Sequence, residues 1–326
     1  MKCLITGGAG FIGSHLAESL ITDGHHVTVI DDFSTGSSEN LDNVKNSPAL
    51  DLVEGDILEI PELEYLICRS DIVFHLAAAV GVELVVHDPV KTIMINVHGT
   101  ERVLKGAERK KTKVIVASTS EVYGKSNHDS FSETDDLLIG PPTHSRWSYA
   151  SSKLLDEFLA MAYFRSIKLP VTVVRFFNTV GPRQTGRYGM VLPRFVEKAI
   201  KGETIEVYGT GKQTRCFCHV SDTIRAVRQL SENTEAIGSV FNIGSREQIS
   251  INQLAEKVIK RLGSKSKIKH IPYEKAYEPG FEDMLKRVPD TGKISKLINW
   301  NPNHSLNEII DSVASYIQKK QAQPSK

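Results

Sequence analysis

The chain has 326 residues, with 40 lysines and arginines against 39 aspartates and glutamates, so its formal net charge is +1. Hydrophobic residues make up 40% of the chain and charged residues 24%, a balance typical of a globular protein with a buried core. The near-neutral charge provides no basic surface for nucleic acid, and the apolar runs are far too short to span a membrane. We therefore expect neither a nucleic-acid partner nor a membrane segment.

The cysteines and the first residues give two further expectations. Residues 1–5 lead directly into a strand pattern, so we expect no secretory signal. The cysteines are few and unevenly spaced, which predicts no disulfide framework and a reducing, cytoplasmic location. Residues 216–219 (Cys-Phe-Cys-His) have ligand chemistry, but no second ligand pair has suitable spacing, so we expect no metal site. The four cysteines are Cys3, Cys68, Cys216 and Cys218.

The first half of the chain alternates strand and helix patterns. Short apolar or β-branched runs predict strands, and apolar residues at helical spacing predict helices. This alternation is typical of βαβ units, whose parallel sheet is covered on both faces. The predicted strands are 2–6, 27–30, 51–54, 72–76, 114–118 and 171–176, and the predicted helices are 11–20, 94–108 and 149–164.

A glycine-rich loop joins the first predicted strand to the first predicted helix. Gly7, Gly10 and Gly13 have the spacing GxxGxxG, which allows a tight turn and close approach of the backbone to a pyrophosphate. The helix that follows starts at Phe11 and Ile12 and offers free N–H groups to the anion. The loop therefore predicts a dinucleotide site.

An acidic pair ends the second predicted strand. Asp31 and Asp32 are placed to accept hydrogen bonds from an adenosine ribose, and no arginine stands beside them to bind a 2′-phosphate, so NAD is favoured over NADP. The alternative is an acidic pair that only forms a turn. Five further residues are candidates for the cofactor site: Asp56, Ile57, Leu76, Ala77 and Ala78. The alternative roles at these positions are turn formation and tight packing.

The second half of the chain has a mixed pattern. We expect helices at 193–201, 222–231, 251–262 and 305–317 and strands at 205–208 and 240–243, with Ser250 as a helix N-cap. The predicted fold class is α/β: a Rossmann-like doubly wound parallel sheet with a smaller mixed α/β substrate lobe. We expect an NAD-binding domain at 1–177 and a mainly sugar-nucleotide-binding lobe at 178–326, some segments of which return to the first domain.

A tyrosine and a lysine stand four residues apart at the start of a predicted helix. Tyr149 and Lys153 therefore project from one face, where an ammonium and a nicotinamide cation favour the phenolate. Thr119 and Ser120 end a predicted strand, at the edge where an open α/β sheet binds its ligand. In isolation, the YxxxK pair could equally be a packed ring and a solvated amine.

Four motifs in this order, TGGAGFIG, HLAA, STSEVYG and YASSK, resemble the extended short-chain dehydrogenase/reductase family, which acts on nucleotide sugars. The resemblance covers nearly the whole chain. It implies NAD as cofactor, Tyr149 as base and Lys153 as its electrostatic helper and ribose ligand. A hydroxyl of Thr119 or Ser120 is implied as the third member. The implied first step is oxidation of sugar C4 to a ketone. The family also implies a homodimer, with helices 94–108 and 149–164 in contact with a second copy, although both could equally pack on the sheet.

Further segments are similar to the UDP-glucuronate decarboxylase group of this family. They are Glu121, the run 144–149 (His-Ser-Arg-Trp-Ser-Tyr), the run 175–183, and the C-terminal runs 280–290 and 299–302. The resemblance implies that Glu121 and Arg287 handle the carboxylate and the C5 proton, that Asn178 lies near the sugar or diphosphate, and that Arg215 meets the diphosphate. Arg146 is expected to be structural.

Other functions remain open at this point. Glu121 could be a structural acid paired with an arginine, and Arg287 could be a surface residue before a proline turn. A UDP-sugar 4-epimerase would use the same Tyr149 chemistry on UDP-glucose, UDP-glucuronate or an N-acetyl sugar, and a 4,6-dehydratase would use Glu121 at C5. A non-catalytic NAD-binding regulator is a different class, but such proteins typically lose the Tyr/Lys pair. The preferred hypothesis is an NAD-dependent UDP-glucuronate decarboxylase that forms UDP-xylose or its 4-keto precursor.

Overall fold

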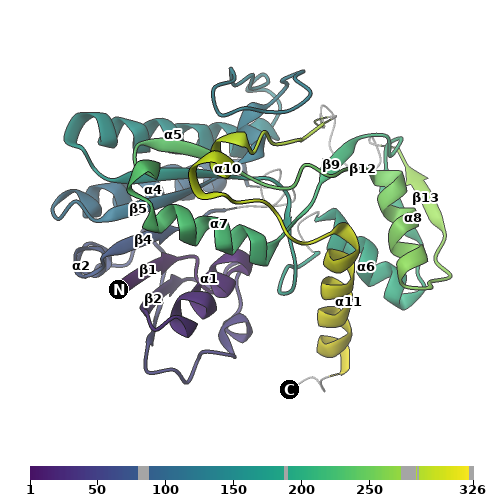
Figure 1. Ribbon diagram of the computed structural model, residues 1–326, viewed down its shortest axis with the longest axis horizontal. Helices are drawn as coiled ribbons and strands as arrows, with labels where there is room; N and C mark the ends of the chain where they lie inside the picture. The colour runs from purple at the N-terminus through teal and green to yellow at the C-terminus, as the bar shows by residue number, and fades with distance from the viewer. Residues whose placement is uncertain (80–87, 187–189, 273–283, 285, 323–326) are drawn as a thin grey trace.

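The computed structural model describes residues 1–79, 88–186, 190–272, 284 and 286–322 (Figure 1). Its centre is a seven-stranded sheet in the order β11-β6-β5-β4-β1-β2-β3, in which every neighbouring pair is parallel. This confirms the predicted Rossmann-like α/β class. The strands are β1 (Lys2–Thr6), β2 (His26–Asp31), β3 (Leu50–Glu54), β4 (Ile72–His75), β5 (Lys113–Thr119), β6 (Val171–Phe176) and β11 (Ser239–Ile243).

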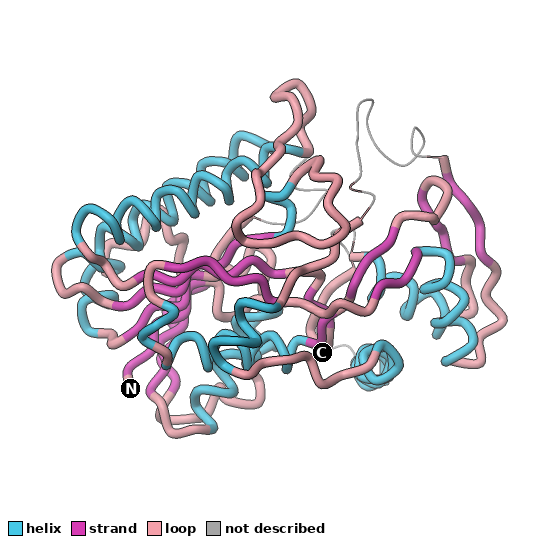
Figure 2. Tube along the Cα trace, turned by 45° about the horizontal axis from the view of Figure 1, so that its top comes forward, coloured by secondary structure: helices cyan, strands magenta, loops and turns pink. Residues whose placement is uncertain are grey.

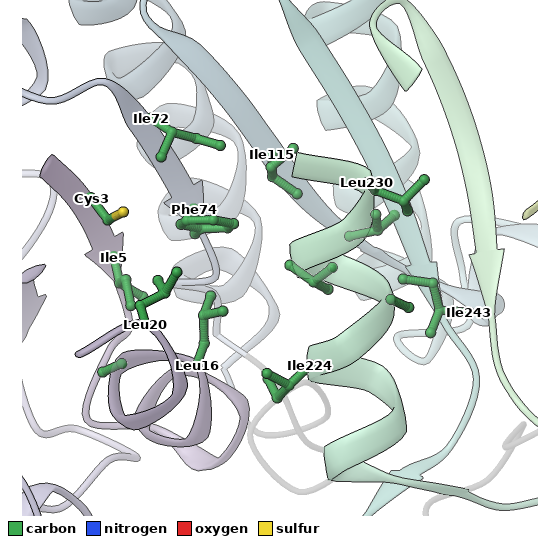
Figure 3. Close-up of a cluster of buried hydrophobic side chains, with 14 of the residues drawn as sticks. Cys3, Ile5, Leu16, Leu20, Ile72, Phe74, Ile115, Ile224, Leu230 and Ile243 are labelled. Carbon is green, nitrogen blue, oxygen red and sulfur yellow. The ribbon is translucent and has the colours of Figure 1, made fainter. Parts of the chain in front are cut away.

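Helices cover both faces of this sheet, as its apolar strands require (Figure 2). One face packs on α1 and α7, where Leu16 and Ile224 meet the strand residues Ile5, Phe74 and Ile115 (Figure 3). The other face packs on α2, α4 and α5 through a second buried cluster. These helices are α1 (Phe11–Thr22), α2 (Leu63–Arg69), α4 (Pro89–Glu108), α5 (Trp147–Ile167) and α7 (Val220–Glu232).

Helix starts follow local capping chemistry. The helix expected at 94–108 begins at Pro89 instead, because Asp88 accepts a hydrogen bond from the Lys91 N–H at 3.0 Å and proline is favourable in the first turn. Ser250 caps its helix as predicted, in a reciprocal capping box with Gln253. Helix α2 has no counterpart among the predicted elements.

A second group of elements, drawn on the right of Figure 1, surrounds its own apolar cluster. The short parallel pair β8–β13 and the helices α6, α8 and α11 form most of it. β11 and α7 come from the second half of the chain but complete the large sheet, so that half returns to the first. The division at residue 177 stays a prediction. The bounds are α6 (Val191–Lys201), β8 (Ile205–Tyr208), α8 (Ile251–Arg261), β13 (Ile268–Ile271) and α11 (Leu306–Ala322).

Short elements join the longer helices and strands. Within the described residues, the helices all lack the combination of length and apolar character that a membrane crossing needs. The short elements are η1 (Ser38–Leu41), η2 (Ser120–Tyr123), β7 (Thr179–Val180), β9 (Thr214–Cys216), β10 (Cys218–His219), η3 (Thr234–Ala236), β12 (Gln248–Ser250) and α10 (Gly292–Ile298).

Trp300 anchors the segment after α10 to the core. Its ring is fully buried, and its indole N–H donates to the Asp222 carbonyl in α7 at 3.0 Å. We expect Trp300→Ala to lower the free energy of unfolding by about 3–5 kcal/mol, because it leaves a large cavity. Chemical denaturation measures this, with Trp300→Phe as a control that keeps an apolar ring. A loss no larger in the alanine variant than in the phenylalanine variant would contradict the anchoring role.

Candidate active site

The glycine loop is held against the segment that follows β4. Gly7 has φ +71°, and a Cβ there would lie 2.7 Å from the backbone nitrogen of Ala77. A Cβ on Gly13 would collide with the Gly7 carbonyl. Gly10 precedes the first residue of α1, so the first helical N–H groups, those of Phe11, Ile12 and Gly13, face no intrahelical acceptor. The loop therefore suits a pyrophosphate in two ways. Its glycines have no side chains to keep the anion away from the backbone, and the start of α1 supplies N–H donors.

Asp31 and Asp32 have different surroundings at the end of β2. Asp31 is buried, and its two carboxylate oxygens accept from the backbone N–H of Ala9 at 2.8 Å and of Phe33 at 2.9 Å. Burial raises the pKa of Asp31, and these backbone donors act against that rise. Each oxygen retains a lone pair for a ribose hydroxyl. Asp32 instead accepts from both the backbone N–H and the hydroxyl of Ser34, as a turn-forming residue does.

The other expected cofactor residues lie around the same edge. Asp56 accepts from the Leu58 N–H at 2.8 Å, the geometry of a local turn. Ile57 is buried. The stretch Leu76, Ala77 and Ala78 follows β4, directly beside the glycine loop. The backbone of Leu76 and Ala77 packs closely on Gly7.

The Tyr/Lys pair sits in the first two turns of α5. Tyr149 is half-buried, and the Thr119 hydroxyl at the end of β5 lies near its phenol. Burial raises the pKa of Tyr149 well above its usual value, and the negative charge of Glu121 raises it further, whereas Thr119 and Arg287 lower it. Lys153 is buried, and its Nζ lies 2.6 Å from the Asp156 carboxylate. The amine is therefore paired within the helix.

Glu121 lies beside Thr119 and Ser120, within the short helix η2. Its carboxylate is 3.2 Å from the Arg287 guanidinium and 4.0 Å from that of Arg146. All three side chains are mostly enclosed, with exposed fractions of 16%, 12% and 5%. Arg287 is therefore not a surface residue. The structure also contains the arrangement expected under the alternative, in which Glu121 is paired with an arginine. This pair lies near Tyr149.

The residues expected to contact the sugar nucleotide lie at the start of the second half of the chain. Asn178 has φ +37° and donates from its amide to the Cys216 carbonyl at 2.9 Å. Arg215 is buried and donates to the carbonyls of Thr214 and Met284, each at 2.8 Å. Residues 280–283 and 285 of the C-terminal run fall outside the described residues.

A buried ionic group behind the hydroxyl strand was not predicted. Glu157 accepts from the Ser118 hydroxyl at 2.5 Å and from the Arg175 guanidinium at 2.9 and 2.7 Å. The bidentate arginine holds α5 against β5 and β6. The signal available in the sequence was the acidic pair Asp156–Glu157, three and four residues after Lys153, on the buried side of an otherwise apolar helix.

Among the residues that the structure describes, no group of three or more His, Cys, Asp or Glu side chains is placed to hold a metal ion. Cys216 and Cys218 are buried, and burial raises the pKa of each thiol to about 12. Thiols of this kind remain protonated and behave as small apolar side chains.

Comparison with known proteins places this site in a family. The family model described as GDP-mannose 4,6 dehydratase matches residues 4–313. A UDP-N-acetyl-alpha-D-glucosaminuronate decarboxylase of Bacillus cytotoxicus is 44% identical over 309 residues, 94% of each chain. UDP-glucuronic acid decarboxylase 1 of Arabidopsis thaliana is 36% identical and covers 97% of this chain and 69% of its own.

Solved structures agree with this placement. UDP-glucuronic acid 4-epimerase of Bacillus cereus, in complex with UDP-glucuronic acid and NAD, superposes with a TM-score of 0.88 at 29% identity, over 98% of this chain and all of that one. The dTDP-glucose 4,6-dehydratase of Bacillus anthracis, in complex with NAD, gives 0.86 at 25% identity, over 99% and 98%. The chain belongs to the family described as GDP-mannose 4,6 dehydratase, within the extended short-chain dehydrogenase/reductases that its motifs resemble.

Proposed function

We propose that this protein is an NAD-dependent decarboxylase of a UDP-linked hexuronate. The observation that carries the proposal is the Glu121 carboxylate between two enclosed arginines, Arg287 and Arg146, beside Tyr149. Oxidation of a C4 hydroxyl needs only the Tyr149, Lys153 and hydroxyl set. An additional acid with two cations suits a step in which a carboxylate is lost and charge develops on the sugar.

The proposed roles follow from the positions of the side chains. Tyr149 takes the proton of the C4 hydroxyl, which Thr119 orients. NAD, when bound at the glycine loop and Asp31, supplies the oxidising equivalents. A ketone at C4 turns the C6 carboxylate into a β-keto acid, which loses carbon dioxide and leaves an enolate. Arg287 stabilises that negative charge, and Glu121 passes a proton taken up from solvent to C5, which gives the 4-keto pentose. Return of the hydride from the reduced cofactor to C4 would then give the pentose.

The identity of the uronate is the finer part of the proposal. The relative that is 44% identical is named for the 2-acetamido uronate, whereas those named for UDP-glucuronate are 33–36% identical. This favours UDP-N-acetylglucosaminuronate as substrate, with UDP-glucuronate as the second candidate. The epimerase alternative retains support from the Bacillus cereus structure.

We expect incubation with NAD and UDP-N-acetylglucosaminuronate to release carbon dioxide and form a UDP-linked 2-acetamido pentose or its 4-keto form. UDP-glucuronate should react more slowly. NMR of the products and capture of carbon dioxide measure both reactions. Tyr149→Phe serves as the control and should be almost inactive while still binding NAD. A product that keeps C6 and differs only at C4 would replace the decarboxylase with the epimerase.

The Glu121–Arg287 pair gives a separate prediction. We expect Arg287→Gln to lower kcat for decarboxylation by about 100-fold or more, because a cation that stabilises developing charge is lost. Binding of NAD should change little. Arg261→Gln, which removes an exposed ion pair with Asp311, is the matched control and should retain full activity. Decarboxylation by Arg287→Gln at the control rate would remove Arg287 from the mechanism.

We also propose a homodimer formed through α4 and α5. The two helices pack against each other and leave large apolar side chains exposed on their outer side. Large apolar side chains exposed on neighbouring helices favour association. The exposed residues are Val90, Ile93, Met94, Leu155 and Phe158, with exposed fractions from 39% to 70%.

The dimer proposal is tested by adding charge to this patch. We expect Phe158→Glu to shift the protein from dimer to monomer in sedimentation equilibrium, because the carboxylate would be buried at the interface. Leu138→Glu, at an exposed loop position, is the control and should leave the mass unchanged. A wild-type monomer at micromolar concentration would contradict the proposal.

A cytoplasmic location remains our proposal for the protein. All four cysteines have free thiols, which supports a reducing compartment.

A further inference from the structure

Asn242 is a fully buried polar residue on β11, and the residues on either side of it are apolar and also buried. A buried amide is costly unless its polar groups have hydrogen-bond partners. Both parts of this amide have them. The oxygen is 2.8 Å from the Tyr123 hydroxyl, and the nitrogen is 2.8 Å from the Phe131 carbonyl and 3.2 Å from the Asp290 carbonyl. Asn242 therefore joins three segments that are far apart in the sequence.

The partners of the Asn242 amide fix its orientation. Peptide carbonyls only accept hydrogen bonds, so the amide nitrogen must face Phe131 and Asp290. The amide oxygen must then face Tyr123, whose hydroxyl donates. Burial raises the pKa of Tyr123 to about 12, so its phenol keeps the proton that this bond needs at neutral pH. A rotated amide would place its oxygen against two carbonyls, and the side chain therefore has one arrangement.

The loop of residues 131–133 docks on the edge of the large sheet at Asn242. β11 is an edge strand, so backbone groups on its outer side need partners from outside the sheet. The Glu133 carboxylate accepts from the Asn242 backbone N–H at 2.8 Å, and the Phe131 carbonyl accepts from its side chain. The Phe131 ring is buried and stacks on the Tyr123 ring, with centroids 4.7 Å apart. The loop is therefore held beside η2.

The same loop holds the segment that follows Arg287. The Phe131 N–H donates to the Val288 carbonyl, and the Asp290 N–H donates to the Phe131 carbonyl, each at 2.8 Å. The two backbones form a short parallel bridge here. Asn242 adds a third hydrogen bond, to the Asp290 carbonyl. The backbone that carries Arg287 is therefore fixed at the next residue along the chain.

The ion pair of Glu121 and Arg287 lies between two segments that Asn242 joins. Tyr123 stands two residues after Glu121 in η2, and Asp290 stands three residues after Arg287. The two charged side chains come from positions 166 residues apart and meet at 3.2 Å. Such a contact depends on how the two backbones are held relative to each other. The hydrogen bonds of the Asn242 amide connect those backbones directly.

We propose that Asn242 is a positioning residue for decarboxylation, because its amide sets the place of Glu121 relative to Arg287. The proposal rests on the roles of that pair in the proposed function. Oxidation at C4 uses Tyr149 and Lys153 on α5, which take no part in the hydrogen bonds of the Asn242 side chain. Loss of this amide should therefore slow the release of carbon dioxide and spare the oxidation that precedes it.

The test separates these two steps in a single turnover with NAD and a UDP-hexuronate. Asn242→Asp keeps the size of the side chain but turns a carboxylate oxygen toward the carbonyls of Phe131 and Asp290, which cannot donate to it. Reduction of the cofactor is followed by its near-ultraviolet absorbance, and carbon dioxide by capture. We expect the ratio of the rate of carbon dioxide release to the rate of cofactor reduction to fall about tenfold or more, because a small displacement of a catalytic group is costly. KM should change little.

A second variant carries the test if Asn242→Asp fails to fold. Tyr123→Phe removes only the hydroxyl on the Glu121 side and keeps the stacked ring, and it should lower the same ratio. Thr172→Val is the matched control for loss of a buried hydrogen bond. The Thr172 hydroxyl lies on β6, which pairs with β11, and donates to the Ala236 carbonyl at 3.0 Å. This variant should keep the wild-type ratio.

A double variant shows whether Asn242 acts through the ion pair. In the Arg287→Gln background the pair is already broken, so we expect Asn242→Asp to lower carbon dioxide release by less than about twofold further. A second fall of about tenfold would mean that the two residues act independently, and would overturn the positioning role.

The outcomes also distinguish this inference from the proposed function. A folded Asn242→Asp protein in which both steps slow equally, or in which neither slows, would overturn the positioning role. Hydrogen exchange requires no turnover: the Asp290 amide should exchange about tenfold faster or more in Asn242→Asp than in Thr172→Val. Equal exchange in these two variants would show that Asn242 does not hold the segment after Arg287. A wild-type protein that releases no carbon dioxide from any UDP-hexuronate would instead overturn the proposed function.

Discussion

The parallel register of the strands at the centre of the sheet is the constraint on which the site depends. It pairs Thr6 with His75 across β1 and β4, and Ser118 with Arg175 across β5 and β6. Because parallel strands end at one edge, loops that are far apart in the sequence supply side chains to one region. Two buried polar groups are built on these register pairs: the Thr6–His75–Thr100 hydrogen bonds and the Ser118–Glu157–Arg175 group.

Opposing charges around Tyr149 set the chemistry of the site. Burial and Glu121 keep the phenol protonated, whereas Arg287 and the Thr119 hydroxyl favour its anion. The positive charge of Arg287, which is paired with Glu121, therefore offsets the rise that Glu121 causes in the pKa of Tyr149. In the proposed mechanism, the acid for the second step, Glu121, lies next to the base for the first, Tyr149, and two arginines near Glu121 offset its negative charge.

Local sequence signals predicted most of the fold. The strands at residues 2–6, 171–176 and 205–208 have the predicted bounds, because a short apolar run with clear ends has few other arrangements. The start of α4 was wrong by five residues, since the exposed apolar residues at 90, 93 and 94 break the helical pattern that burial alone would give. Strand β13, whose middle residues are polar and exposed, was missed for a similar reason.

The site was predictable only in part. Two motifs could be found from the sequence because their residues stand only a few positions apart: the Tyr149–Lys153 pair and the glycine loop from Gly7 to Gly13. The contact between Glu121 and Arg287 joins positions 166 residues apart and was expected only through resemblance to a family. The proximity of Arg146 to Glu121, and the pairing of Lys153 with Asp156, depend on side-chain orientations that no spacing rule contains.

The entry of β11 and α7 into the large sheet has a consequence for the growing chain. During synthesis β6 remains an open strand edge, and the apolar face under α7 remains uncovered, until residues 220–243 have left the ribosome. A nascent chain with an unpaired edge and exposed apolar surface is a target for chaperones and for aggregation. The nucleotide-binding half is thus completed late, by a segment translated long after it.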